Sequence, residues 1–253
     1  MLIDTHCHLD TAEFDTDRDA VHAAALAAGV ERIVVPAVTV DSFRKVKTSV
    51  ERYPGCVAAY GIHPLCLMQA RESDLAVLRD WLERERPVAV GEIGLDFHVT
   101  DSDPALQEFY FVEQLKLARE FDLPVLLHVR RAIDRILMHL RRIRVPGGIA
   151  HAFNGSRQQA DEFIRLGFKL GFGGAMTFPG STRIRKLAAE LPLAAIVLET
   201  DAPDIPPAWL GGGRNSPAEL PRIASVLADL RSLPENEVAA LCAAAARAVL
   251  PRL

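Results

Sequence analysis

Six side chains of the kinds that bind metal ions stand at the ends of short apolar runs. His6 and His8 follow Ile3, and residues two apart on a strand point to the same side, so their side chains are expected roughly 6 to 7 Å apart along it. Two imidazoles at that spacing can share one ion. The other four side chains end runs elsewhere in the chain: Glu92, His128, His151 and Asp201. These residue types predict metal-dependent hydrolysis.

Two divalent cations account for this set better than one. A single catalytic ion keeps a coordination position open, so six ligands exceed what it needs. Two ions that share a carboxylate use all six, and Glu92 is the expected bridge because it lies in the middle of the set. The other expected ligands are His6, His8 and Asp201 for one ion, and His128 and His151 for the other. Asp201 is also expected to orient the water that the cations activate, or to accept its proton.

A site without metal is the structural alternative. Four imidazoles and two carboxylates would then meet in one dry cavity, where an unpaired carboxylate costs several kcal/mol. That alternative needs many further partners, so the metal hypothesis is favoured.

Eight short runs rich in Val and Ile predict strands that are covered on both faces. They are Leu2–His6, Arg32–Ala37, Val57–Ile62, Val88–Glu92, Val125–His128, Gly148–His151, Lys169–Gly173 and Ala195–Glu199. Helical segments separate them. One begins at Asp103-Pro104, an N-cap followed by proline, and another at Ser216-Pro217, where Glu219 is expected to complete a capping box. This alternation predicts parallel strands joined by right-handed crossovers.

The candidate ligands decide between two α/β architectures. A doubly wound open sheet has the same alternation, but its edge strands lie too far apart to share a site, whereas a barrel brings all strand ends to one mouth. We therefore predict a (β/α)8 TIM barrel, a single domain over residues 1–253. Extra C-terminal helices are expected at Pro217–Leu230 and Pro234–Leu250, outside the barrel or against its floor.

Composition restricts the partners and the compartment. The net charge of -4 gives no overall basic field, so contact with nucleic acid would need a local patch or bound cations. The four cysteines form no CxxC pair, which favours reduced thiols in the cytoplasm. The first predicted strand begins at Leu2, leaving no room for a signal peptide, and no apolar stretch approaches the roughly 20 residues that span a membrane. We expect a cytoplasmic protein without a membrane segment.

Five motifs, in order along the chain, resemble the TatD family of metal-dependent hydrolases, part of the amidohydrolase superfamily. They are Asp4-Thr5-His6-Cys7-His8, Gly61-Ile62-His63-Pro64, Gly91-Glu92-Ile93-Gly94-Leu95-Asp96, Leu123-Pro124-Val125 through His128, and Glu199-Thr200-Asp201-Ala202-Pro203. The resemblance implies a distorted TIM barrel, two divalent metals and deoxyribonuclease activity, chiefly the hydrolysis of phosphodiester bonds from the end of a DNA strand. The family's ligand positions match the six residues named above. The pair Phe97-His98 departs from the usual aromatic pair, which leaves the substrate preference open.

Three neighbours of the expected site have two interpretations each. His63 could donate a hydrogen bond to a phosphoryl oxygen of the substrate, or it could cap the junction of strand and loop. Arg130, together with Arg131, could bind a phosphate through a guanidinium fork, or either could form a solvated salt bridge. Asp96 could orient a ligand or cap a turn.

The leading prediction is a metal-dependent exonuclease that cleaves phosphodiester bonds at DNA or RNA ends, with Zn²⁺, Mg²⁺ or Mn²⁺ as the cations. A rival in the same class is an esterase, lactonase or deacylase with the same metal centre, and a third possibility is a metal-occupied scaffold without turnover. The ligand-bearing runs contain no lysine that could be carboxylated to bridge the ions, which favours the nuclease. No obligate protein partner is inferred, and a monomer is expected.

Overall fold

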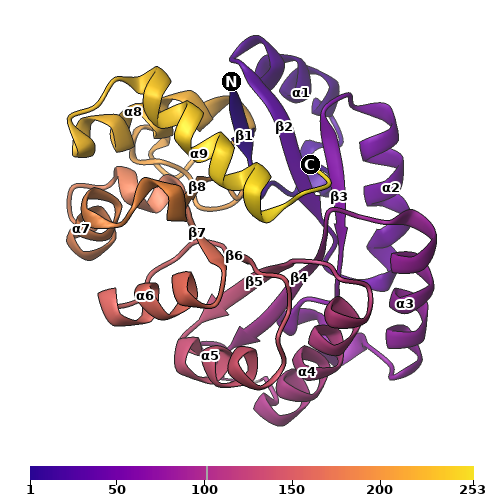
Figure 1. Ribbon diagram of the computed structural model, residues 1–253. Helices are drawn as coiled ribbons and strands as arrows, with labels where there is room; N and C mark the ends of the chain where they lie inside the picture. The colour runs from indigo at the N-terminus through magenta and orange to yellow at the C-terminus, as the bar shows by residue number, and fades with distance from the viewer. Residues whose placement is uncertain (101) are drawn as a thin grey trace.

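The computed structural model describes residues 1–100 and 102–253, and these residues form eight parallel strands in one sheet (Figure 1). Each strand pairs with the next along the chain, as a barrel requires. The strands are β1 Leu2–Asp4, β2 Val30–Pro36, β3 Cys56–Tyr60, β4 Ala89–Asp96, β5 Val125–Arg130, β6 Gly148–Ala150, β7 Phe168–Phe172 and β8 Ile196–Leu198.

The barrel closes irregularly, in the segments that follow β1 and β8. The amide of Thr5 donates to the carbonyl of Leu198 (3.1 Å), that of Asp201 to His6 (2.8 Å) and that of His8 to Ala202 (2.8 Å). We call this closure the seam. It confirms the distorted barrel and excludes the open sheet, whose first and last strands would not meet.

All of the helices but the last form an outer ring around the strands (Figure 1). The helices are α1 Arg18–Ala27, α2 Phe43–Arg52, α3 Ser73–Glu85, α4 Pro104–Glu120, α5 Ile133–Arg142, α6 Arg157–Arg165, α7 Thr182–Glu190, α8 Leu220–Arg231 and α9 Glu235–Val249. None of the described helices is long and apolar enough to cross a membrane.

The last helix closes the floor of the barrel. Side chains of α9, among them Ala246 and Val249, pack in one buried cluster with strand residues that point inward, such as Ile3, Leu126 and Ile149. Helix α8 lies beside α7 and completes the outer ring. The opposite end of the barrel, where the strands end, is therefore open for a functional site.

Two strands run further than predicted. β4 and β5 stay paired beyond Glu92 and His128, up to the partners Asp96 and Arg130. Gly94 lies inside this extension, with a φ of 153°, and a Cβ there would overlap the carbonyl of His128. The glycine therefore permits a close strand approach rather than ending the strand.

The predicted caps of two helices had different outcomes. The Asp103 carboxylate accepts hydrogen bonds from the amides of Ala105 and Leu106, so the start of α4 is confirmed. The Ser216 hydroxyl accepts the amide of Ala218 (3.3 Å), as an N-cap before Pro217 should, but the predicted capping box is wrong in its second half. The Glu219 carboxylate instead accepts a hydrogen bond from the indole of Trp209 (2.7 Å), and a 3₁₀ turn over Pro217–Glu219 precedes α8.

Candidate metal centre

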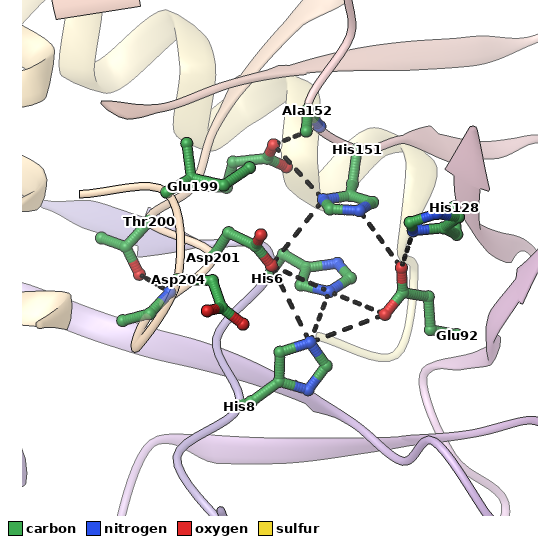
Figure 2. Close-up of polar contacts among 12 residues, drawn as sticks. His6, His8, Glu92, His128, His151, Ala152, Glu199, Thr200, Asp201 and Asp204 are labelled. Atoms are coloured by element: carbon green, nitrogen blue, oxygen red, sulfur yellow. Dashed lines mark hydrogen bonds and ion pairs between the residues drawn. The ribbon is translucent and has the colours of Figure 1, made fainter. Parts of the chain in front are cut away.

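The Glu92 carboxylate lies between two groups of imidazoles (Figure 2). Its Oε2 is 3.3 Å from Nε2 of His6 and 3.5 Å from Nε2 of His8. Its Oε1 is 3.1 Å from Nδ1 of His128 and 3.1 Å from Nε2 of His151. Each oxygen thus faces a separate group of imidazoles, and Oε1 also lies 3.5 Å from Nε2 of His63. This is the arrangement that a bridging carboxylate needs.

Asp201 adds a second carboxylate to the group around His6 and His8. Its Oδ1 lies 3.5 Å from Nε2 of His6 and 3.8 Å from Nε2 of His8, while the two Nε2 atoms are 3.3 Å apart. Atoms that surround a tetrahedral Zn²⁺ at about 2.0 to 2.1 Å are about 3.3 Å from one another. The spacing of these donor atoms therefore fits one shared cation, and the structure brings all six predicted ligand residues together.

The pKa shifts of Glu92 and His151 also indicate that this site requires positive charge. Burial raises the pKa of Glu92, but His63, His6 and His151 outweigh it and hold that pKa well below its usual range. Burial lowers the pKa of His151, but Glu92 and Asp201 hold it well above its usual range. The buried carboxylates thus demand positive charge beside them, which either protons or metal cations can supply.

A network of hydrogen bonds holds the loop that carries Asp201. The carboxylate of Asp4 accepts the amide (2.9 Å) and the hydroxyl (2.6 Å) of Thr200. The Asn215 side chain, which is fully buried, donates to the carbonyls of Thr200 (2.7 Å) and Asp204 (2.9 Å). Asp201 itself has a φ of 57°, a strained value for a residue other than glycine. The network fixes this conformation and directs the carboxylate toward His6 and His8.

Glu199 is a buried carboxylate at this site that the sequence analysis missed. Its Oε1 accepts the amide of Ala152 (2.5 Å) and lies 3.7 Å from Nδ1 of His151 (Figure 2). It therefore faces the ring nitrogen of His151 that points away from Glu92. Its position two residues before Asp201, on the same side of an extended segment, was the available signal.

Asp96 has both of its anticipated roles. Its Oδ2 lies 3.0 Å from Nε2 of His128, and its Oδ1 accepts the amide of His98 (2.9 Å). Burial raises the pKa of Asp96, but the contact with His128 outweighs it and lowers the pKa to about 2. An ionised Asp96 keeps the proton of His128 on Nε2 and turns Nδ1 toward Glu92.

Two glutamines of α4 hold the backbone near the site. Gln114 accepts the amide of Ile62 (2.7 Å) and donates to its carbonyl (3.1 Å). Gln107 makes the same pair of bonds with Asp96, at 2.7 and 2.9 Å. Each glutamine thus makes the two hydrogen bonds that a neighbouring strand would make, at positions beyond the end of the β3–β4 ladder. These bonds fix the start of the loops that carry His63 and Phe97.

The predicted substrate-binding residues line a cavity of about 830 Å³ over the metal centre. His63 places Nε2 3.5 Å from Oε1 of Glu92, and its Nδ1 accepts the amide of Leu65. It therefore caps the strand-loop junction and faces the centre at once, within reach of the group around His128. Arg130 and Arg131 lie on the cavity wall, and neither forms an ion pair with any residue that the structure describes.

Comparison with known proteins agrees with this geometry. The family described as TatD related DNase matches residues 3–251. The Escherichia coli K12 protein named uncharacterized metal-dependent hydrolase YjjV is 44% identical over 241 residues, covering 94% of this chain and 93% of YjjV. The crystal structure of YjjV aligns with a TM-score of 0.95 at 42% identity, over 99% of this chain and 98% of that one. The 3'-5' ssDNA/RNA exonuclease TatD of Cronobacter sakazakii is 35% identical over 237 residues, covering 91% of this chain and 90% of that protein. The chain therefore belongs to the TatD family of metal-dependent hydrolases.

Proposed function

We propose that this hydrolase is an exonuclease that removes nucleotides from the ends of single-stranded DNA or RNA. The observation that carries the proposal is the Glu92 carboxylate, whose two oxygens face separate groups of imidazoles in a cavity that Arg130 and Arg131 also line. Two bound cations would stabilise both the attacking and the leaving oxygen when a phosphodiester is hydrolysed. The name of the Cronobacter relative supports the same substrate class.

The proposed cation ligands are the six residues predicted from the sequence. Glu92 would be shared, with His6, His8 and Asp201 on one side and His128 and His151 on the other. Bound divalent cations supply Lewis-acid chemistry, which lowers the pKa of water and stabilises negative charge as it develops. Four imidazoles and two carboxylates suit Zn²⁺, while Mn²⁺ and Mg²⁺ are the other candidates.

The side chains of this centre have separate roles in the proposal. Without bound cations, burial raises the pKa of Asp201 to about 7, although His151 and His8 lower it. Bound cations would lower this pKa, so Asp201 would be ionised and able to accept a proton from water. Arg130 and His63 would orient the phosphodiester, because a guanidinium and an imidazole N–H both donate hydrogen bonds to phosphoryl oxygens. Glu199 and Asp96 would hold His151 and His128 in place.

The test is a cleavage assay with end-labelled single-stranded DNA and RNA in Zn²⁺, Mn²⁺ or Mg²⁺. We expect stepwise shortening that EDTA abolishes and that Asp201→Asn reduces by at least about 100-fold. Asp229→Asn, at an exposed carboxylate of α8, is the matched control and should retain activity. Turnover of carboxylic esters or amides without any shortening would replace the proposal with an esterase or amidase.

A further inference from the structure

A second groove continues from the cavity over the metal centre. It has a volume of about 600 Å³ and lies over the start of α5, where Phe97, Ile133 and Met138 form much of its lining. Arg131 and Ile133 line both the groove and the cavity. A substrate that occupies the cavity can therefore extend into the groove without leaving the protein surface.

The junction of the two spaces is built by the paired ends of β4 and β5. Asp96 is the register partner of Arg130, and the amide of Phe97 donates to the carbonyl of Arg130 (2.9 Å). Phe97 and Arg131 are therefore the residues that directly follow these two neighbouring strands. Arg131 has a φ of 54°, which is strained backbone, and its side chain is exposed.

The lining chemistry suits a flat, uncharged ring rather than a phosphate. Two charged residues of the groove have partners already, since Arg135 donates to Glu108 (2.7 Å) and Asp134 accepts from Gln159 (2.8 Å). Arg131 is the remaining cation of the lining, and it forms no ion pair with any described residue. A phenyl ring and a guanidinium beside aliphatic side chains can stack on a nucleobase whatever its identity.

The geometry points to a nucleobase subsite in this groove, formed by Phe97, Arg131, Ile133 and Met138. Its ligand is the base of a nucleotide next to the phosphodiester that lies over the metal centre, so the preferred substrate is an oligonucleotide rather than a small phosphodiester. This inference rests on the proposed nuclease function, which supplies the chain that reaches the groove.

The experiment compares five substrates of three kinds with the metal-loaded protein. They are a single-stranded DNA oligonucleotide, the same oligonucleotide with one abasic residue at each of its three terminal positions in turn, and a fully abasic oligomer of the same length, which has no aromatic ring. We expect an abasic residue at one position to lower kcat/KM by about tenfold or more. Phe97→Ala should produce the same loss on the intact oligonucleotide, with little added loss on the abasic one, and Phe97→Trp should restore cleavage.

A matched variant and a binding measurement separate stacking from loss of stability. Phe121→Ala removes a ring of the same partly buried class at the end of α4, and it should behave like wild type. Fluorescence anisotropy of the labelled oligonucleotide in EDTA should show weaker binding to Phe97→Ala than to Phe121→Ala.

The outcomes distinguish the subsite from the nuclease. If all abasic oligonucleotides are cleaved as fast as the intact one, or if Phe97→Ala slows the fully abasic oligomer by the same factor as the intact oligonucleotide, the subsite is wrong and the nuclease stands. If wild type cleaves no oligonucleotide with any of the cations, the nuclease is wrong and the subsite is lost with it.

Discussion

Glu199 is a buried carboxylate that lies beside a predicted metal ligand, His151. Its Oε1 lies 3.7 Å from Nδ1 of His151, and neither its Oε2 nor that Nδ1 has a hydrogen-bond partner among the described residues. A carboxylate behind a ligating imidazole orients the ring and raises its basicity. We therefore propose that Glu199 positions His151 for the cation that this imidazole would bind.

We expect Glu199→Gln to weaken the affinity for one divalent cation by about 10- to 100-fold. The amide oxygen can still accept from Ala152, so the change removes charge and leaves the backbone contact. Calorimetric titration of metal-free protein with Zn²⁺ or Mn²⁺ measures this affinity. Glu162→Gln, on the outer helix α6, is the control, and equal affinities for both variants would contradict the positioning role.

Residue types and strand alternation were sufficient to predict which six side chains meet, because parallel strand ends share one mouth. They could not predict Asn215 or Gln114. The function of those amides depends on which backbone groups tertiary packing leaves unpaired, and no local pattern records that. Glu219 shows the reverse case, since its local motif was present but a tertiary partner, Trp209, competed for the carboxylate.

At the level of elements, two glutamine side chains of α4 make the backbone hydrogen bonds that a neighbouring strand would otherwise make. The Gln114 side chain is 1% exposed and satisfies both backbone groups of Ile62, just before His63. Replacing it with an apolar side chain of similar length leaves a buried donor and a buried acceptor without partners.

Gln114→Met should lower the free energy of unfolding by about 2 to 6 kcal/mol, from two unsatisfied groups at about 1 to 3 kcal/mol each. Urea denaturation followed by circular dichroism measures the change. Lys116→Met, at an exposed position of the same helix, should change it by less than about 0.5 kcal/mol. A loss of the same size in both variants would mean that helix propensity, and not the backbone contact, is responsible.

The order and type of the elements followed from the alternation of apolar runs, but their ends did not. β1, β6 and β8 stop before their predicted ligands, while β4 and β5 run past theirs. Gly94 explains the longest error, because a glycine that permits close backbone contact is locally identical to one that ends a strand.

On the scale of the whole molecule, α9 completes the barrel from outside the repeated strand-helix unit. Ala246 is 1% exposed and packs with residues inside the barrel, whereas Ala244 faces solvent on the same helix. The two alanines therefore test the same substitution on opposite faces.

Ala246→Asp should destabilise the protein by at least about 3 kcal/mol, because it buries a carboxylate without a partner. Ala244→Asp should remain within about 0.5 kcal/mol of wild type. Thermal and urea unfolding of the pair give both values. Similar stabilities would show that α9 does not seal the floor.

Cation binding should also stabilise the entire fold, because the proposed ligands come from β4, β5 and the segments after β1, β6 and β8. A cation at 100 times its Kd adds about 2.7 kcal/mol for each site. For a domain of this size that corresponds to a rise in Tm of about 5 to 10 °C. Calorimetry with and without EDTA measures the shift, and Glu92→Gln should abolish most of it. An unchanged Tm in wild type would argue against tight binding.

The seam also joins residues that the ribosome adds at very different times. His6 and His8 are synthesised well before Asp201, and Asn215, which holds the loop of Asp201, follows later still. A nascent chain that stops before Asp201 carries five of the six proposed ligands, but the group around His6 and His8 still lacks its second carboxylate. Binding of a cation by His6, His8 and Asp201 together would therefore require that translation has passed Asp201.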